Sequence, residues 1–461
     1  MSYFPVTNDQ PNTTGTVPSV ARVDISPAKP RALRIALLGY RSHPHVGGQG
    51  IYLQYLSKAL VELGHSVDVI SGPPYPELDP RVRLIQLPSL DLYAHPNPTR
   101  ALRLKHCLSL ADFYEWWSKL SGAFGEPYSF GRRLRAHFKK YKPYYDIVHD
   151  NQSLCYCLLD LQKRGVNIVA TVHHPITQDR DLALAAATEK GQRWLINRWY
   201  SFLAMQKNVV QQLSHVITVS QQSQRDIAAA FDRPAQNIQV IPNGVDTNIF
   251  KPLDNISRTP FRLITTASSD QPLKGLSVLL RALAQLRSEF PELHLIVIGK
   301  LKENGDTQKE LQALNLQDVV QFKSGISNQE LVEEYAQASI AIVPSLYEGF
   351  GLPAAEAMAC AVPLICSDGG ALPEVVGDAA RLVRAGNVDD LQSALRELLI
   401  DENAREHLGA QGRMHILQQL SWDCVGKKME HFYYQVLQQQ EQDDPVLDRE
   451  LSSEQIQNAY D

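Results

Sequence analysis

The sequence predicts an α/β protein of two doubly wound domains, each with a parallel sheet covered by helices. The 461 residues exceed what one ordinary core accommodates, so two domains of roughly 200 residues each are expected. Short apolar runs alternate with helical patterns, which is the order typical of parallel sheets. This alternation occurs in two successive series, separated by the segment 242–246.

The first series begins at Arg34 with the apolar run RIALLG. A loop at 40–50 leads into a helix whose apolar face is formed by Leu53, Leu56, Leu60 and Leu63, and which ends at Gly64. Further strands are expected at residues 67–70, 145–149, 167–172 and 215–219. The second series has a helix at 275–289 and strands at residues 261–266, 294–298, 319–322, 340–344 and 362–366.

These series divide the chain into five parts. A disordered tail rich in Pro, Thr, Asn and Ser is expected at 1–30, because it offers little apolar surface to bury. The two domains are predicted at 31–245 and 246–420, followed by a helix at 421–437 that packs back toward the first domain. A polar tail is expected at 438–461.

Composition restricts the classes of protein. A net charge of -5 argues against a general nucleic-acid binder. No apolar run reaches the roughly 18 residues of a spanning helix, and the start lacks the pattern of a signal peptide. The six cysteines are scattered and mostly lie in apolar runs, which predicts reduced, buried thiols. A cytoplasmic protein is therefore expected.

A glycine loop between a strand and a helix is the most informative segment. Its sequence, at 345–353, is SLYEGFGLP, and Pro353 suits the first position of the helix that follows. Glycines let the backbone approach a ligand, and a helix start favours a diphosphate. Glu348 and Glu356, the latter expected in the first helical turn, flank this site. Since carboxylates repel phosphate, both are expected to accept hydrogen bonds from sugar or ribose hydroxyls.

Two other segments favour the same ligand. The segment 46–50, VGGQG, opens a helix after the first strand, but it lacks the GxGxxG spacing of a dinucleotide site. Lys274, just before a helix, can supply a cation to a departing diphosphate.

Together these motifs resemble those of glycosyltransferase family 4, whose members are retaining enzymes of the GT-B fold, with two Rossmann-like domains facing a central cleft. The resemblance rests on EGFGLPAAE with the following AMACAVPLICSDGGALPEVV, and on the VGGQG, PNGVD and PLKG segments in the family's order. It implies that Glu348 contacts the donor sugar and Glu356 the nucleotide ribose. The diphosphate would meet Lys274 and the backbone of Gly47, Gly48, Phe350, Gly351 and Leu352.

The resemblance also assigns a histidine and exposes one departure. His173 matches the family histidine that contacts the transferred sugar, with the adjacent His174 as the alternative. The family arginine six residues before Lys274 is replaced by Ser268. Either another basic residue, with Lys300 as the candidate, supplies the cation, or the site uses Lys274 and the helix dipoles alone.

Two further segments contain aspartate residues that could belong to a site. The segment 150–152, Asp-Asn-Gln, is expected to point toward the acceptor. The segment 179–181, Asp-Arg-Asp, is interpreted as a helix start rather than a metal motif. Neither a metal nor a cofactor is expected, and the nucleotide sugar is a co-substrate.

A basic stretch at 132–142 indicates the acceptor side. It holds six Lys and Arg residues and follows the aromatic residues Phe113, Tyr114, Trp116, Trp117, Phe124, Tyr128 and Phe130. Basic charge beside exposed aromatics suits an anionic membrane surface, although a solvated helix face over partly buried aromatics has the same pattern.

The predicted function is hexosyl transfer from a nucleotide-diphosphate sugar, with a UDP-sugar favoured. A glycolipid or lipid-linked acceptor at the inner face of the membrane is preferred. The alternatives are a soluble saccharide or small-molecule acceptor, a sugar-nucleotide epimerase of the same architecture, and a noncatalytic binding protein.

Overall fold

In the computed structural model, residues 31–443 are described except for 45–47, 93, 95, 96, 101 and 268. The predicted tail 1–30 and residues 444–461 lie outside this description, as does the side chain of Cys107. The described residues from Leu33 onward belong to one compact unit. The last helix continues to Asp443, which corrects the expected start of a polar tail at 438.

The first sheet has seven parallel strands in the order β3-β2-β1-β4-β5-β6-β7. The edge strands β3 and β7 escaped prediction because they are short and only partly buried. The strands are β1 (Arg34–Gly39), β2 (Ser66–Ser71), β3 (Arg83–Gln86), β4 (Ile147–Asn151), β5 (Ile168–Val172), β6 (His215–Thr218) and β7 (Ile238–Val240).

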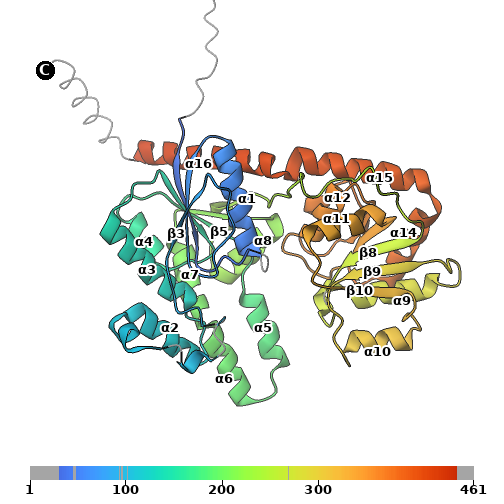
Figure 1. Ribbon diagram of the computed structural model, residues 1–461, viewed down its shortest axis with the longest axis horizontal. Helices are drawn as coiled ribbons and strands as arrows, with labels where there is room; N and C mark the ends of the chain where they lie inside the picture. Colours follow the sequence, from blue (N-terminus) through green and yellow to red (C-terminus); the bar gives the residue numbers. More distant parts are fainter. Residues whose placement is uncertain are drawn as a thin grey trace, which may run out of the picture. The chain divides into compact units, whose positions relative to one another are not determined.

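Helices cover both faces of this sheet. The core on one face includes residues of α3, α4, α7 and α8, with Cys155 and Cys157 as buried free thiols, and the core on the other includes residues of α1 and α16 (Figure 1). Asp179 lies in the first turn of α5, so the Asp-Arg-Asp segment is confirmed as a helix start. The α-helices are α1 (Gly48–Glu62), α2 (Leu110–Leu120), α3 (Glu126–Tyr141), α4 (Tyr156–Gln162), α5 (Thr177–Ala186), α6 (Lys190–Trp199), α7 (Leu203–Gln212), α8 (Gln221–Phe231) and α16 (Trp422–Asp443), joined by the 3₁₀ turns η1 (Pro98–Arg100), η2 (Leu104–Leu108), η3 (Tyr200–Phe202) and η4 (Ala235–Asn237).

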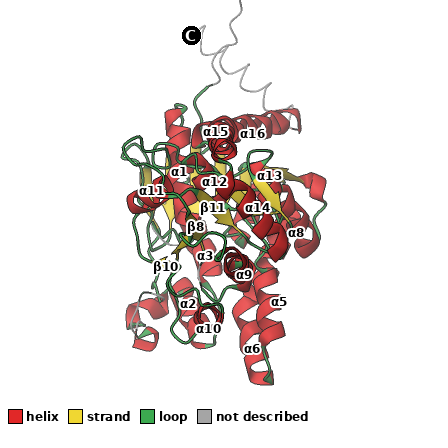
Figure 2. Ribbon diagram, turned by 90° about the vertical axis from the view of Figure 1, so that its right-hand side faces the viewer, coloured by secondary structure: helices red, strands yellow, loops and turns green. Residues whose placement is uncertain are grey.

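The second sheet has six parallel strands in the order β10-β9-β8-β11-β12-β13, enclosed by helices (Figure 2). Its strands are β8 (Arg262–Thr266), β9 (His294–Ile298), β10 (Val320–Lys323), β11 (Ile340–Val343), β12 (Leu364–Ser367) and β13 (Arg381–Val383). Its helices are α9 (Leu276–Leu286), α10 (Asp306–Ala313), α11 (Asn328–Gln337), α12 (Leu352–Ala359), α13 (Leu372–Val376), α14 (Val388–Ile400) and α15 (Glu402–His415), with the short turns η5 (Pro272–Lys274) and η6 (Ile416–Leu420). The predicted fold class, two doubly wound parallel sheets, is confirmed.

The last helix, α16, is anchored in the core of the first sheet. The hydroxyl of Tyr433 lies 2.5 Å from Nδ1 of His149, and Nε2 of His149 lies 2.6 Å from Oγ1 of Thr171. Burial lowers the pKa of His149 to about 3, so its imidazole is neutral. The chain thus returns from the second sheet to the first, although the exact domain boundaries stay predictions.

Candidate active site

The loop between β11 and α12 holds an ion pair. Oε1 of Glu348 accepts hydrogen bonds from Nζ of Lys274 at 2.7 Å and from Oγ of Ser345 at 2.8 Å. The Glu348 side chain is largely buried, at 12% exposed, whereas that of Lys274 is 34% exposed. A cation and a hydrogen-bond acceptor therefore stand side by side before the helix start. Such a pair can contact a phosphate and a sugar hydroxyl of one ligand.

Glycines allow three loops to meet at this ion pair. Gly275 has a φ of +66°, and a Cβ there would lie 1.9 Å from the carbonyl oxygen of Pro344. A Cβ on Gly370 would lie 2.3 Å from the carbonyl oxygen of Glu348. Any other residue would push these loops apart. Sequence reasoning did not single out Gly369 and Gly370, although a glycine pair directly after a buried strand is a usable signal.

The start of α12 differs by one residue from the prediction. Gly351 has a φ of +99° and stands before the helix, so Leu352 is the first helical residue and Pro353 the second. Glu356 is consequently the fifth residue of the helix, and its predicted place in the first turn is wrong. Phe350 is buried, at 5% exposed, so its backbone rather than its ring is what a ligand could reach.

The Glu356 carboxyl is partly buried beside this helix start. Burial raises its pKa to about 8, so it is mostly protonated at neutral pH. Burial raises the pKa of Tyr55 on α1 to about 12, and the charges of Asp246 and Glu356 add to this effect. A neutral carboxyl both donates and accepts hydrogen bonds, which suits a hydroxyl-bearing ligand.

His173 lies at the carboxyl end of β5 and is held by two amide side chains. Its Nε2 lies 2.7 Å from Oδ1 of Asn151, and its backbone N–H donates to Oε1 of Gln152 at 2.7 Å. The ring also packs edge-on against Tyr52, at a centroid distance of 4.8 Å. Burial lowers the pKa of His173 to about 3. The imidazole is therefore neutral and firmly oriented.

Asn151 connects this histidine to the start of α1. Its Nδ2 donates to the carbonyl oxygen of Gln49 at 2.9 Å, which leaves Oδ1 facing His173. An acceptor facing Nε2 requires that Nε2 carry the proton, so the lone pair of His173 is on Nδ1.

The expectation that the segment 150–152 points toward an acceptor is wrong for Asp150. This residue is 0% exposed, and its carboxylate accepts from the Ser153 hydroxyl and from the backbone N–H of Leu154 at 2.9 Å. Asn151 and Gln152 are almost as deeply buried. The segment instead forms the buried end of β4 and the residue after it, from which Asn151 and Gln152 contact His173.

The His173 loop and the Glu348 loop face the same space. Oγ of Ser220 and Oγ of Ser223, at the start of α8, donate to the carbonyl oxygen of Gly349 at 2.7 and 3.0 Å. A Cβ on Gly349 would lie 3.8 Å from Cβ of His174. Sequence reasoning missed both serines, although Ser220 follows the carboxyl end of β6 and caps α8.

Two further residues that the sequence singled out, Gly48 and Lys300, can be placed in the structure. Gly47 and Ser268 lie outside the described residues. Gly48 is the first residue of α1, and a Cβ there would meet nothing within 4 Å. The carbonyl oxygen of Lys300 accepts from Oγ of Ser269 at 2.9 Å.

The basic stretch on α3 is less exposed than its sequence indicated. Arg133 turns inward, where its Nη2 lies 2.5 Å from Asp112 and 2.7 Å from Glu115. Burial at these three side chains is consistent with a structural ion-pair cluster between α2 and α3. The other five basic residues of the stretch, Arg132, Arg135, Lys139, Lys140 and Lys142, are exposed.

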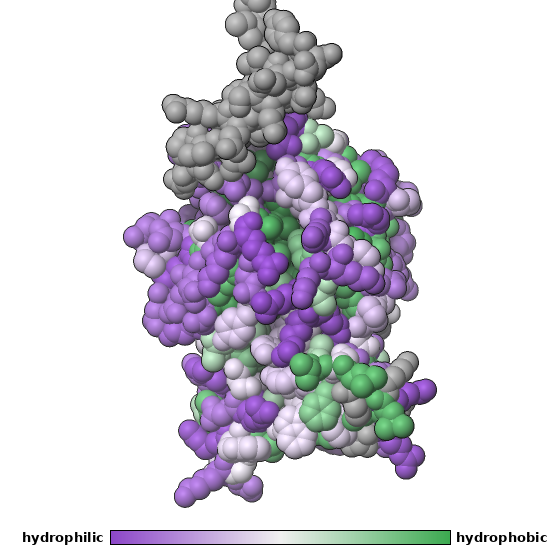
Figure 3. All heavy atoms as spheres, turned by 90° about the vertical axis from the view of Figure 1, so that its left-hand side faces the viewer, coloured by the Kyte–Doolittle hydropathy of each residue, from purple (hydrophilic) through white to green (hydrophobic). Residues whose placement is uncertain are grey.

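The nearby aromatic residues also differ in how far they are exposed. Phe130 is 3% exposed, whereas Phe113 and Trp117 are 43% and 53% exposed. Helices η2 and α2 also expose the large aliphatic side chains of Leu104, Leu108, Leu110 and Leu120. Figure 3 shows hydrophobic side chains gathered toward the lower end of one face of the molecule. No helix within the described ranges is both long and apolar enough to span a membrane.

Comparisons with known proteins identify the family. A family model described as Glycosyltransferase Family 4 matches residues 46–249, and one described as Glycosyl transferases group 1 matches residues 254–415. The chain therefore belongs to the family 4 type of glycosyltransferases, and it has their two-domain GT-B fold.

Named relatives agree with this class. The chain is 45% identical over 401 residues to the MMP alpha-(1->4)-mannosyltransferase of Mycolicibacterium hassiacum, covering 85% of this chain and 96% of that protein. It is 27% identical over 431 residues to the D-inositol 3-phosphate glycosyltransferase of Kribbella flavida, covering 87% and 95%. The sucrose-phosphate synthase structure from Thermosynechococcus elongatus superposes with a TM-score of 0.63 at 24% identity, covering 87% and 98%, and shares the fold. The chain is thus an enzyme that transfers glycosyl groups.

Proposed function

We propose that this enzyme transfers a mannosyl residue from a nucleotide-diphosphate mannose to a sugar hydroxyl, forming an α-(1→4) linkage with retention of anomeric configuration. The observation that carries the proposal is the ion pair between Lys274 and Glu348, with 2.7 Å between Nζ and Oε1, in the glycine loop before α12.

The donor fits the groups around that loop. The N-terminus of α12 and Lys274 stabilise the negative charge that develops on the departing diphosphate. The neutral Glu356 carboxyl hydrogen-bonds the ribose hydroxyls, and Glu348 accepts from a hydroxyl of the donor sugar. His173 is neutral and orients the transferred sugar through a hydrogen bond rather than a charge. Retention is implied by the family resemblance.

The choice of mannose and of the linkage follows the relative with 45% identity, which covers most of both chains. The nucleotide base is left to a donor screen, in which the UDP-sugar that the sequence favoured is one arm.

A lipid-linked acceptor is a second candidate. The exposed Phe113 and Trp117, together with the exposed leucines of η2 and α2, form an apolar surface near the basic side chains of α3. Such a surface suits peripheral contact with an anionic membrane at its inner face. Loss of lipid-acceptor activity in a Trp117→Ala variant, with saccharide transfer unchanged, is the result that favours this acceptor.

The test combines a thermal-shift screen of nucleotide sugars with mass spectrometry of the reaction products. Uridine, guanosine and adenosine diphosphate-mannose and the corresponding glucose donors are each mixed with oligosaccharide acceptors and, separately, with a lipid extract. We expect release of free nucleoside diphosphate and a product extended by one hexose. Glu348→Gln is expected to lower kcat/KM by about 100-fold, as loss of a charge-stabilising contact does.

The matched control is Glu406→Gln, at an exposed glutamate of α15. Donor turnover to an isomeric nucleotide sugar without acceptor would indicate an epimerase. Donor binding without release of nucleoside diphosphate would indicate a binding protein. Undiminished transfer by a well-folded Glu348→Gln variant would contradict the proposed site.

A further inference from the structure

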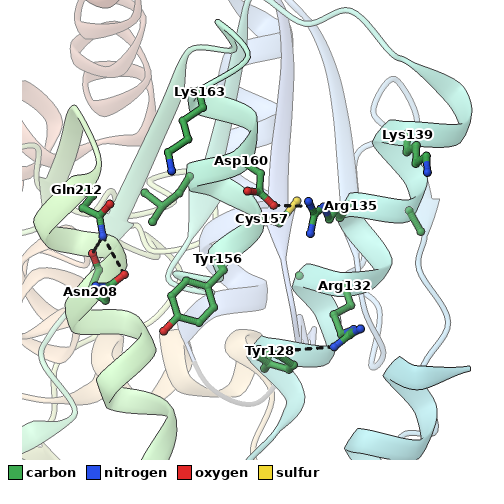
Figure 4. Close-up of a pocket in the computed structure, with 13 residues that line it drawn as sticks. Tyr128, Arg132, Arg135, Lys139, Tyr156, Cys157, Asp160, Lys163, Asn208 and Gln212 are labelled. Carbon is green, nitrogen blue, oxygen red and sulfur yellow. Dashed lines mark hydrogen bonds and ion pairs between the residues drawn. The ribbon is translucent and has the colours of Figure 1, made fainter.

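A concave surface lies on the outside of the helices that cover the first sheet. The elements that form it do not include the loops that carry Glu348 and His173. Helix α4 forms its floor, with α3 on one side and α7 on the other (Figure 4). Its volume is about 720 Å³, which is enough for a small saccharide. We call it the α4 groove, and the side chains that characterise it are Tyr128, Arg132, Arg135, Tyr156, Asp160 and Lys163.

The α4 groove carries excess positive charge. Arg132, Arg135 and Lys139 line it from α3, and Lys163 lines it from the end of α4. Among the described residues that line it, the only carboxylate is that of Asp160, whose Oδ2 lies 3.3 Å from Nε of Arg135. Four cations against one carboxylate leave the groove with an excess of three positive charges. Within the described residues no carboxylate lies within ion-pair distance of Lys163 or Arg132.

The positive charge is concave rather than spread over a convex helix face, because α3 packs closely on the loop before α4. Gly131 is buried, and a Cβ there would lie 2.7 Å from Cβ of Cys155. This close approach brings the α3 side chains to the edge of the short α4. Concentrated cations around a concave surface bind an anionic ligand more strongly than isolated surface lysines do.

Aromatic and amide groups complete the groove. The rings of Tyr128 and Tyr156 meet edge to face, with centroids 6.5 Å apart, and Tyr156 is 45% exposed. On the α7 side, Nε2 of Gln212 donates to Oδ1 of Asn208 at 2.9 Å. Figure 4 shows Lys163 and Tyr156 on the same side of α4, with the Lys163 amine directed toward these amides. A tyrosine ring with adjacent amides suits a flat, hydroxyl-bearing body such as a sugar ring.

We propose that the α4 groove binds a phosphorylated saccharide, with the phosphate at the α3 arginines, the sugar ring against Tyr156 and the sugar hydroxyls toward Lys163 and the α7 amides. The shared chemistry is a phosphate ester on a polyol, carried either by a soluble sugar phosphate or by a phosphosugar lipid headgroup. The α4 groove does not include the donor loops, so phosphosugar binding there does not depend on the proposed mannosyl transfer.

The test is isothermal calorimetry of the full chain, without nucleotide sugar, at low salt. Mannose 6-phosphate is the probe, and mannose and inorganic phosphate are titrated separately as its component parts. We expect mannose 6-phosphate to bind at least tenfold more tightly than either part. The double variant Arg132→Gln/Lys163→Gln and the variant Tyr156→Ala are each expected to weaken binding by about tenfold or more, because each removes a charge-assisted or stacking contact.

Two variants serve as controls. Lys140→Gln removes one positive charge, half the change made by the double variant, at an exposed residue of α3 that does not line the groove, and binding should be retained. Lys274→Ala disables the donor loop, and binding should also be retained. Equal losses in Lys140→Gln and in the groove variants, or loss in Lys274→Ala, would overturn the proposal, as would an absence of binding to both sources of phosphosugar.

The lipid source is tested by flotation with vesicles of phosphatidylcholine containing equal fractions of either phosphatidylinositol or phosphatidylglycerol. Preferential binding to phosphatidylinositol that is lost in the groove variants supports the proposal with a lipid-borne headgroup. Equal binding to both vesicles that survives the groove variants, without binding of the soluble probe, would show a nonspecific electrostatic surface and overturn it.

Discussion

Asn151 holds His173 by a side-chain hydrogen bond of 2.7 Å while its amide nitrogen donates to the carbonyl oxygen of Gln49, 2.9 Å away. One buried amide therefore fixes both the orientation of the histidine ring and the start of α1. It also determines which ring nitrogen carries the proton. A buried amide thus decides how the ring of His173 is oriented.

Replacing Asn151 by alanine should lower kcat by about fivefold, because a hydrogen bond worth about 1 kcal/mol no longer orients His173. The donor KM should change little, since the ion pair at Lys274 is untouched. Steady-state kinetics at saturating acceptor measures both. Asn151→Asp should restore the acceptor for Nε2 and raise the pKa of His173, which NMR of the imidazole would detect.

The matched control for Asn151→Ala is Asn167→Ala. Asn167 also uses its amide nitrogen to donate to a backbone carbonyl, that of Asp146, at 3.0 Å. It lies just before β5, at the end of that strand away from His173. A similar fall in kcat in both variants would indicate a general loss of sheet stability instead of lost positioning.

Lys300→Gln should weaken donor binding by several-fold if Lys300 supplies the cation that the residue at 268 lacks. The reason is the adjacency of its backbone to Ser269, three residues beyond the carboxyl end of β8. The neighbouring exposed Lys302 provides the control Lys302→Gln. Calorimetric titration with the preferred nucleoside diphosphate distinguishes the two, and equal affinities would exclude Lys300 from the site.

Glu356→Gln should become progressively more stable than the parent protein as the pH rises. The folded pKa of Glu356, about 8, lies above the value of 4.5 expected for an unfolded glutamate. The folded state therefore binds the proton more tightly, and its advantage is lost as the pH rises from about 4.5 through 8. Thermal melts between these values should separate the two proteins, with coincident melts at acid pH.

Glu406→Gln, at an exposed residue of α15, is the control and should have the same melting temperature as the parent protein at every pH. A constant difference between Glu356→Gln and the parent across the whole range would mean that the Glu356 carboxyl is not held neutral in the fold.

Tyr433→Phe should lower the free energy of unfolding by about 1–3 kcal/mol, because the buried His149 loses its hydrogen-bond partner. Urea denaturation measures the change. Tyr434→Phe, at the next residue of α16, is the control for a tyrosine outside the His149 hydrogen bonds. An unchanged stability in Tyr433→Phe would mean that the hydrogen bond between Tyr433 and His149 does not stabilise the fold.

The fold was predictable because parallel strands are continuous apolar runs and their helices repeat at every third or fourth residue. The prediction was wrong where an element is too short to show these patterns. Strands β3, β7 and β13 have three or four residues and exposed positions, so their pattern is too short to recognise. Helix α12 begins one residue earlier than predicted, after Gly351, which adopts a left-handed conformation. Glycine permits this conformation but does not require it, so the sequence alone could not place the helix start.

The candidate site was predictable as a set of residues but not as a set of contacts. Glycine spacing and the family resemblance pointed to Glu348, Lys274 and His173. The sequence could not indicate that Lys274 and Glu348 form an ion pair, because 74 residues separate them. Nor could it indicate that Asp150 faces inward while Asn151 supports His173, since adjacent residues on a strand point to opposite sides.

By itself, the sequence determined the class of enzyme, the two sheets and the loops that carry the chemistry, because these depend on local patterns of apolar residues and glycines. Only the tertiary structure decided the protonation of Glu356 and His173, the partner of Lys274, and the α4 groove. These properties depend on burial and on contacts between distant segments, and desolvation and charge act through space rather than along the chain.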